Sequence, residues 1–312
     1  MDQDVKVIYI AGISHSGSTL LGHTLGEVER FVYGGEIRNI WQRGLLEDRA
    51  CCCGVSFRKC PFWSTVIKER FPALSHAEIT TFAQFHARHV RLRGLPAFAG
   101  FGSDHRLVAP YRDSLVLLYR AIRDVANADV VVDSSKSPWY AWVLGTSPGI
   151  DLSIVHLVRD PRGNVYSFMR RGRVARHEIV ARAGRWLSWN VATESLARVV
   201  RARYVRVRYE DFVQSPQASL EEIGSGVGVA VNMPAKLSGS RITLQPKHIF
   251  SGNRARGVVG EVNLRLDDDW RQVLPRPVQL AITATAAPLV RRYGYPILSD
   301  RPPREERAAR TG

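Results

Sequence analysis

The sequence is short of acidic residues and has no long apolar segment. Its 312 residues include 29 Asp and Glu against 44 Lys and Arg, which gives a formal net charge of +15. This excess of positive charge attracts nucleic acid, anionic membranes or small acidic ligands, without deciding among them. No apolar run approaches the roughly 20 residues of a membrane-spanning helix, and the N-terminus lacks the basic start and cleavage site of a signal peptide. We therefore expect a cytoplasmic protein that does not span a membrane.

Cysteine is also scarce, and it is confined to one short stretch. The four residues are Cys51, Cys52, Cys53 and Cys60, and their spacing excludes a disulfide framework for a chain of this length. Adjacent cysteines do not easily converge on one ion, so the sequence disfavours zinc and predicts no metal site. Reduced, disulfide-bonded and metal-bound states of these cysteines stay open at this point.

Alternating strand-like and helix-like segments predict an α/β fold. Residues 5–11 form a β-branched and aromatic run, typical of a strand buried on both faces of a parallel sheet, and apolar residues recur at helical spacing from Ser18. Further strands are predicted at residues 130–133, 153–158 and 204–207, with helices at residues 114–125 and 186–201. This order favours one domain with a central parallel sheet, whose ligand binds at the carboxyl ends of the strands.

The domain is predicted to span residues 1–300. Residues 44–110 hold the cysteines and many His and Arg, and we interpret them as a helical or irregular cap-like insertion over one end of the sheet. Residues 301–312 have almost nothing to bury and are predicted to form a disordered tail.

A glycine loop follows the first predicted strand and opens the first predicted helix. Gly12 and Gly17 have the G-x4-G spacing of a phosphate-binding loop, in which successive backbone N–H groups face an anion. Nucleoside triphosphatases carry a lysine after the second glycine, but Ser18 stands there in this chain. The loop therefore predicts a bound 5′-phosphate, while hydrolysis of a γ-phosphate is disfavoured.

A second anion site is predicted where another strand ends. Arg159 offers a planar fork for a phosphate, Asp160 can cap the next helix, and Pro161 fits its first turn. Ser167 and Arg171, one turn apart on that helix, add a hydroxyl and a cation. An Arg-Asp-Pro segment alone is as often a structural ion pair as a ligand site, so this site depends on the glycine loop for its interpretation.

These two segments resemble motifs of the sulfotransferases that use 3′-phosphoadenosine 5′-phosphosulfate (PAPS). ISHSGSTLL looks like their 5′-phosphosulfate loop, and VRDPRGNVYSFMRR looks like their 3′-phosphate motif. Residues 207–212 are similar to the family's YED segment, and residues 248–256 to the late loop that closes on the nucleotide. The resemblance implies a P-loop NTPase-like sulfotransferase fold of the bacterial small-molecule type, with PAPS as donor, 3′,5′-bisphosphate adenosine (PAP) as product and no required metal. It implies nucleotide contacts from Ser14, His15, Ser16, Gly17, Ser18, Thr19, Arg159, Ser167, Arg171, Tyr209, Asn253 and Arg256.

Three residues are candidates for catalysis. Glu36 lies in a segment that resembles the GE-x-x-R stretch of tyrosylprotein sulfotransferases, which implies that it is the base, and we expect burial to raise its pKa. Lys136 follows a predicted strand and matches a lysine of the same branch, which implies that it stabilises the bridging oxygen. His15 stands where family members commonly carry Lys or Arg, and it can donate a hydrogen bond or a proton.

The function predicted from these residues is transfer of a sulfuryl group from PAPS to a hydroxyl of a small molecule, an activity of the EC 2.8.2 type. A secondary metabolite, a lipid or a glycan is the expected acceptor. One alternative is a P-loop kinase or phosphotransferase, which the missing lysine disfavours. Another is a non-enzymatic basic protein that binds nucleotides or nucleic acid, but the sequence has no nucleic-acid module, and we expect no nucleic-acid partner. A homodimer stays open.

Overall fold

The computed structural model describes residues 3–298 apart from residues 92, 94–99, 101–102 and 173–175, so the tail predicted at residues 301–312 lies outside the described residues. At its centre is a five-stranded parallel sheet with the strand order β2-β3-β1-β4-β5. The strands are β1 (Val5–Ala11), β2 (Phe31–Tyr33), β3 (Val130–Lys136), β4 (Ile150–Val158) and β5 (Arg203–Arg208). The predicted α/β fold with a central parallel sheet is confirmed.

Strand β1 occupies the middle of this sheet and is buried on both faces. Val7 and Tyr9 point into one apolar core, whereas Ile8 and Ile10 point into another on the opposite face. Alternate side chains of a strand face opposite sides of its sheet, so an apolar residue at nearly every position is what a doubly covered strand needs.

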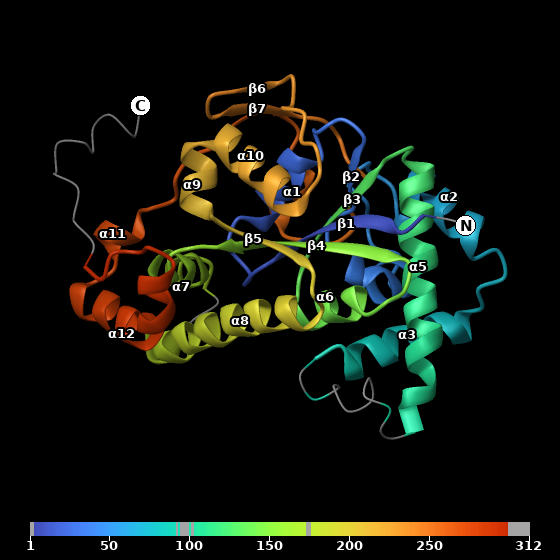
Figure 1. The fold of residues 1–312 in the computed structure, drawn as a ribbon, viewed down its shortest axis with the longest axis horizontal. Coiled ribbons are helices and arrows are strands. Elements are labelled where there is room, and N and C mark those ends of the chain that lie inside the picture. The colour runs from blue at the N-terminus through green and yellow to red at the C-terminus, as the bar shows by residue number, and fades with distance from the viewer. Residues whose placement is uncertain (1–2, 92, 94–99, 101–102, 173–175, 299–312) are drawn as a thin grey trace.

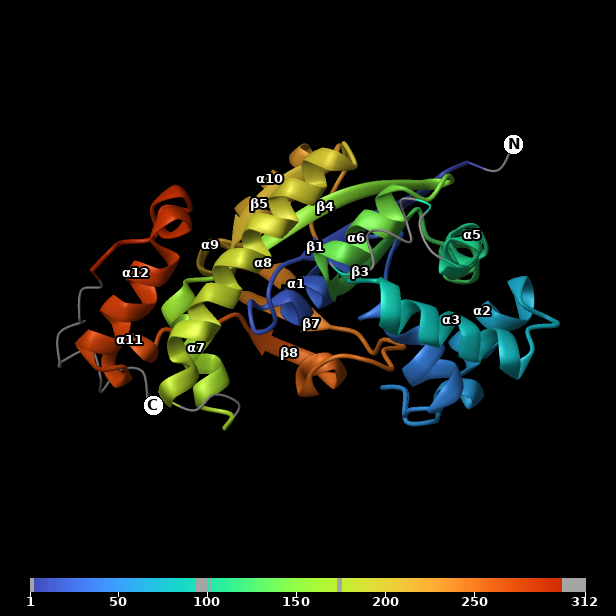
Figure 2. The ribbon, with the colours of Figure 1, turned by 90° about the horizontal axis from the view of Figure 1, so that it is seen from below.

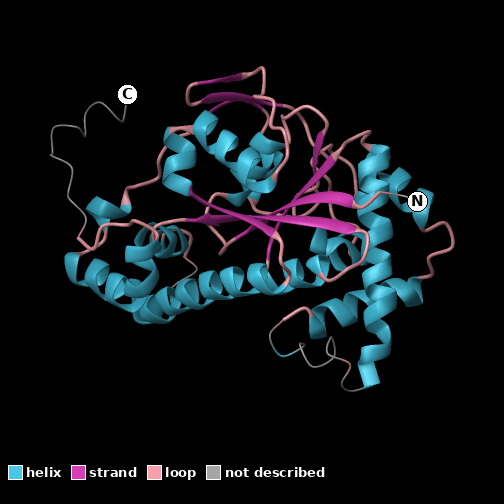
Figure 3. Cartoon of the chain, viewed as in Figure 1, coloured by secondary structure: helices cyan, strands magenta, loops and turns pink. Residues whose placement is uncertain are grey.

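Helices form a layer on each face of the sheet (Figures 1 and 3). One layer contains α1 (Ser18–Leu25), α9 (Tyr209–Gln214) and α10 (Pro216–Val227). The other contains α5 (Val108–Val125), α6 (Pro138–Gly145) and the long α8 (Ile179–Val199). None of the described helices is long and apolar enough to cross a membrane.

Two further groups of helices lie at opposite ends of the molecule (Figure 2). At one end are α7 (Pro161–Met169), α11 (Trp270–Val273) and α12 (Arg276–Arg292). At the other end, α2 (Pro61–Arg70) and α3 (His76–His89) belong to the predicted cap-like insertion and lie beside α5. Single turns of 3₁₀ or π helix join these elements: η1 (Ile37–Asn39), η2 (Ile40–Leu46), η3 (Phe57–Lys59), η5 (Ser103–Leu107), η6 (Arg176–Glu178) and η7 (Arg254–Gly257).

The structure extends several predicted elements and adds one sheet. Strand β3 continues through Asp-Ser-Ser-Lys to Lys136, because its ladder with β1 pairs Asp133 with Tyr9 and, after a shift in register, Lys136 with Ala11. The predicted helices at residues 114–125 and 186–201 begin earlier, at Val108 and Ile179. A small antiparallel sheet of β6 (Leu237–Ser238), β7 (Arg241–Leu244) and β8 (Gly260–Asn263) was not predicted, since its strands are too short to show an alternating pattern.

Candidate active site

The glycine loop joins β1 to α1, as the sequence predicts. Gly12 has a φ of 144°, and a Cβ there would lie 2.4 Å from the carbonyl oxygen of Leu157. Gly17 has a φ of 94°, and a Cβ there would lie 2.5 Å from the ring of Tyr209. Both positions therefore require glycine, for the backbone angle and for the close approach of a neighbour.

The loop also holds a polar group that has no partner in the described part of the chain. The hydroxyl of Ser16 is buried and makes no hydrogen bond there. Leaving such a group unsatisfied costs about 1–3 kcal/mol, which a bound acceptor would remove. Ser18 and Thr19 are buried in the first turn of α1, where backbone N–H groups and the helix dipole favour an anion. These residues fit a phosphate group.

Lys136 ends β3 in an unusual backbone conformation. Its φ is 68°, and the pairing between β1 and β3 shifts register where Lys136 lies opposite Ala11. Such irregularities re-aim a side chain, and a non-glycine residue at positive φ persists only where its surroundings enforce it. The Nζ atom of Lys136 donates to Glu36 Oε1 at 2.5 Å and to the carbonyl of Ser134 at 3.2 Å.

Glu36 is held at one edge of the site by this lysine and by an amide. Asn39 Nδ2 donates to Glu36 Oε2 at 3.0 Å, and Asn39 occupies the position, three residues after the glutamate, where the tyrosylprotein-type stretch has its arginine. Burial acts to raise the pKa of Glu36, but Lys136 and the nearby Arg38 and Arg43 outweigh it and hold the pKa below its usual value. The expectation of a raised pKa was therefore wrong, because the sequence did not reveal this ring of cations.

A buried carboxyl fixes the segment that carries Glu36. Asp133 Oδ1 accepts from the amide and the hydroxyl of Ser135, at 2.7 and 2.5 Å, and the Ser135 hydroxyl accepts the Arg38 N–H at 3.1 Å. Tyr119 donates to the other oxygen of Asp133 at 2.5 Å. Burial raises the pKa of Asp133 to about 6. This network ties the end of β3 to the chain just after Glu36.

A cavity of about 820 Å³ opens between these elements and is rich in cations. Its lining residues are Ser14, His15, Gly17, Ser18, Thr19, Glu36, Arg38, Arg43, Arg49, Lys136, Arg171, Gly252, Asn253, Arg254, Ala255 and Arg256. Glu36 is the one carboxylate among them, against six arginines and a lysine. A cavity with this balance of charge suits a polyanionic ligand.

The structure brings Arg159 and Ser167 together behind the loop, but neither is among the described residues that line the cavity. Arg159 is buried; its guanidinium donates to the carbonyls of His15 at 3.1 Å and Asp267 at 2.8 Å. It also pairs with the Asp267 carboxylate at 3.1 Å and lies over the ring of Tyr209. Ser167 Oγ lies 3.1 Å from Nδ1 of His15. Arg159, Ser167 and Tyr209, three residues predicted to contact the nucleotide, thus contact the glycine loop but are not among the described residues that line the cavity.

The late loop reaches the cavity, although one of its expected residues does not. Asn253 lines the cavity and caps η7 by accepting the Ala255 N–H at 2.9 Å. The carbonyl of Arg256 lies 3.1 Å from Nε2 of His23 on α1, which holds η7 against the helix. His248, at the start of this stretch, instead lies beside Cys60.

Several lining residues were missed by the sequence analysis. Arg43 and Arg49 lie on and just after η2, where no motif identifies them. Ser251 Oγ accepts from Asn39 Nδ2 at 2.9 Å and from Arg43 Nη1 at 3.0 Å, and so connects the late loop to the Glu36 segment. Positive charge is the only feature of the sequence that could have identified Arg43 and Arg49.

Comparisons with known proteins identify the family of this chain. A family model described as "Sulfotransferase family" matches residues 8–232. The sulfotransferase domain of the Synechococcus PCC 7002 olefin synthase is 21% identical, with a TM-score of 0.52 over 97% of this chain and 98% of that domain. A sulfotransferase from Alicyclobacillus acidocaldarius is 13% identical, with a TM-score of 0.36 over 90% of this chain and 95% of that one. No curated protein matches the sequence. The family match spans the glycine loop, the Glu36–Lys136 pair and the Arg159 segment, and with it this chain belongs to the sulfotransferase family.

Proposed function

We propose that this protein transfers the sulfuryl group of PAPS to a hydroxyl of a small-molecule acceptor. The observation that carries the proposal is the position of the Glu36–Lys136 pair, which lines the same cation-rich cavity as the glycine loop. A base and a cation are the two groups that in-line transfer of this kind requires. A secondary metabolite, a lipid or a glycan is the proposed class of acceptor.

The donor is proposed to lie with its 5′-phosphosulfate end on the glycine loop. Residues 14–19 provide the buried hydroxyl of Ser16, the hydroxyls of Ser18 and Thr19, and the turn enforced by Gly17. For the 3′-phosphate, Arg171 lines the cavity, and Arg159 and Ser167 both contact His15, which also lines it. A ligand at Arg159 would replace the contacts that its guanidinium makes with Asp267.

In the proposed reaction, the acceptor oxygen attacks sulfur while the bond from sulfur to the bridging phosphate oxygen breaks. Glu36 accepts the proton of the attacking hydroxyl, and the lowered pKa of Glu36 keeps it ionised near neutral pH. Lys136 stabilises the negative charge that develops on the bridging oxygen, with a hydrogen bond from His15 at the leaving phosphate. PAP and the sulfated acceptor are the products, and no metal is needed to balance the step.

Binding measurements with three adenine nucleotides test the donor assignment. Calorimetry of the full chain should give an affinity for PAP at least about tenfold above that for ADP, which has no 3′-phosphate, and ATP should bind no better than ADP. Equal affinities for PAP and ADP would remove the 3′-phosphate site. Magnesium-dependent turnover of ATP would instead favour a phosphotransferase.

Transfer itself is tested by following PAP release from PAPS with a set of alcohols and phenols as acceptors. We expect acceptor-dependent PAP formation and a mass increase of one sulfuryl group on the acceptor, with no dependence on added magnesium. PAP release that is the same with and without acceptors would contradict the transferase assignment.

A further inference from the structure

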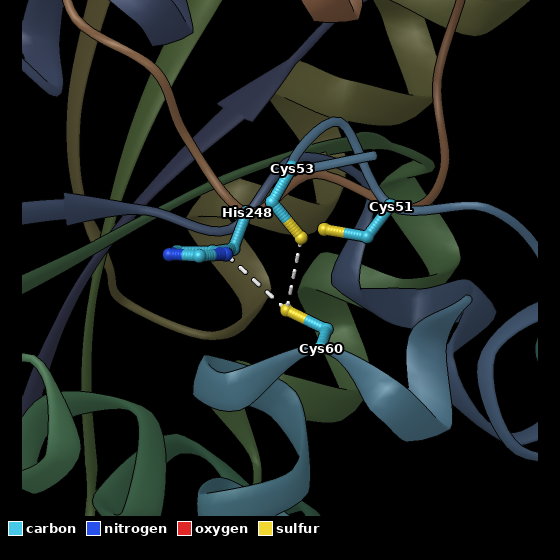
Figure 4. A group of neighbouring side chains, drawn as sticks. All are labelled: Cys51, Cys53, Cys60 and His248. Atoms are coloured by element: carbon cyan, nitrogen blue, oxygen red, sulfur yellow. Dashed lines mark hydrogen bonds between the residues drawn. The ribbon is translucent and has the colours of Figure 1, made fainter. Parts of the chain in front are cut away.

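Four side chains with metal-binding atoms converge outside the cavity. Cys51, Cys53 and Cys60 come from the chain between η2 and α2, and His248 comes from the distant segment that precedes η7. Their three sulfur atoms and a ring nitrogen all lie within 4.8 Å of one another. Cys53 Sγ is 3.5 Å from Cys60 Sγ, which in turn is 3.2 Å from His248 Nδ1 (Figure 4).

We propose that these four side chains bind a structural zinc ion. Three thiolates and one imidazole form a complete tetrahedral zinc set that leaves no position for a substrate, which is the pattern of structural rather than catalytic sites. With zinc–sulfur bonds of about 2.3 Å and a zinc–nitrogen bond of about 2.0–2.1 Å, ligand atoms are about 3.6–3.8 Å apart. The Cys53–Cys60 and Cys60–His248 distances are a few tenths of an ångström shorter than this, and no two ligand atoms are more than 4.8 Å apart, so small adjustments of the side chains bring the four atoms to the geometry of a zinc site.

The local backbone explains how three closely spaced cysteines can converge. Cys51 and Cys53 are separated by one residue, and the turn at Gly54, with a φ of 94°, brings the chain back toward Cys60. Cys52 between them turns the other way, toward the core beneath α1, and its sulfur lies 3.6 Å from where a Cβ on Gly257 would be. Adjacent cysteines do not easily bind one ion, but Cys51 and Cys53 are not adjacent, and Cys52 between them is not part of the cluster.

Backbone hydrogen bonds hold the cysteines of the cluster in place. The Cys51 N–H donates to the Val55 carbonyl at 2.8 Å, and the Gly54 N–H donates to the Cys51 carbonyl at 3.0 Å, which fixes the turn that carries Cys53. The Cys60 N–H donates to the Phe57 carbonyl at 3.2 Å, just before α2 begins. Hydrogen bonds around metal ligands orient them for the ion.

The proposed ion would position the late loop of the active site. Next to the cluster, the Cys52 N–H donates to the Ile249 carbonyl at 3.0 Å, and the Trp63 indole donates to the His248 carbonyl at 2.7 Å. Three residues after His248, Ser251 contacts the Glu36 segment, and residues 252–256 line the cavity. The zinc site therefore connects the segment before α2 to the loop that supplies five of the sixteen described residues lining the cavity, and none of the four ligands is among those sixteen.

Metal analysis of the purified full chain tests this proposal without any nucleotide. Protein expressed with added zinc and dialysed against a weak chelating resin should retain about one zinc per chain, bound by the Cys₃His set. Cys53→Ser is the main variant because Cys53 is exposed and its loss leaves the core intact. It should lose most of the zinc, whereas the matched variant Cys52→Ser should retain it.

Thermal unfolding gives a second measurement that does not depend on a variant. Removal of zinc by a strong chelator should lower the melting temperature by roughly 5–15 °C, and added zinc should restore it.

Cobalt substitution should give the intense sulfur-to-metal charge-transfer absorption of a thiolate site, reduced in Cys53→Ser and unchanged in Cys52→Ser. The proposal would be overturned if the wild-type protein contained no zinc or if the two serine variants contained equal amounts. It would also be overturned by a disulfide in the cluster, detected as two fewer free thiols before reduction than after it.

Discussion

Two ion pairs, each with a buried cation, flank the glycine loop, and they differ in what they face. Lys136 pairs with Glu36 at 2.5 Å, and both side chains line the cavity. Arg159 pairs with Asp267 at 3.1 Å, but it is packed beneath the loop and over Tyr209. Each cation lies at or just after the carboxyl end of a parallel strand, where sequence reasoning predicts a ligand. Position at a strand end therefore brings a cation to the site, while side-chain packing decides whether it meets the ligand directly.

The two pairs also differ in how they are held. The side chains of Lys136 and Glu36 are only 10% and 12% exposed, yet both face a cavity that a ligand can enter. The Asp267 side chain is 25% exposed, so its carboxylate can move away from Arg159 into solvent. The backbone carbonyl of Asp267 is a second acceptor for Arg159. We expect the first pair to control the chemical step and the second to control nucleotide affinity.

The largest effect is expected from Glu36→Gln. Glutamine keeps the size of the side chain and a contact to Lys136 but cannot accept the proton of the acceptor, so turnover should fall about 10²–10⁴-fold. PAP affinity should stay within about threefold of the wild-type value. Steady-state rates and calorimetry on the same preparations measure both.

Glu78→Gln is the matched control for this change. Glu78 forms the capping box of α3 with Ser75, a role that glutamine also fills, and it does not line the cavity. Its turnover should be unchanged. Wild-type turnover in Glu36→Gln would remove Glu36 from the mechanism and leave the first pair a structural one.

Lys136→Met should lower turnover about 10²–10³-fold and also change its pH dependence. In the wild-type protein the pKa of Glu36 is below its usual value, so the rate should fall only when the pH drops through that lowered pKa. Without the lysine, burial dominates and raises the pKa of Glu36, so the acid limb of the rate profile should move to higher pH. Rates measured from about pH 4 to pH 8 test the direction. An acid limb that does not move would show that Lys136 does not set the ionisation of Glu36.

Arg159→Ala should lower PAP affinity about 10–100-fold, the value of a charge-assisted hydrogen bond, while ADP affinity changes little. Asp267→Asn distinguishes direct binding of the 3′-phosphate by Arg159 from a structural role of the ion pair, because it breaks the ion pair but keeps Arg159. If Asp267 competes with the 3′-phosphate for the guanidinium, Asp267→Asn should bind PAP as well as or better than the wild type. Equal losses of PAP affinity in both variants would show that the ion pair stabilises the glycine loop and that Arg159 does not bind the phosphate.

The comparison of the pairs also explains how much the sequence could predict. The strand, the glycine loop and helix α1 are adjacent in the chain, so local patterns predicted them, and the parallel sheet followed from the same alternation. The lowered pKa of Glu36 and the burial of Arg159 depend on residues about 100 positions away, such as Lys136 and Asp267. The convergence of His248 with three cysteines is of the same long-range kind. Local spacing carries no information about such contacts, which form only when the chain has folded.

Ser16→Ala, the smallest effect, tests the loop that lies between the two pairs. The Ser16 hydroxyl is buried without a partner among the described residues, so its removal should relieve an unsatisfied group and raise the melting temperature by about 1–3 °C. PAP affinity should fall about three- to tenfold, since the hydroxyl is proposed to donate to the 5′-phosphate. The exposed Ser188 on α8 is the matched control, and Ser188→Ala should change neither value. Higher stability with lower affinity is the combination expected of a group kept for its ligand; unchanged PAP affinity would mean that the 5′-phosphate is held by the backbone of the loop alone, with the two pairs acting around it.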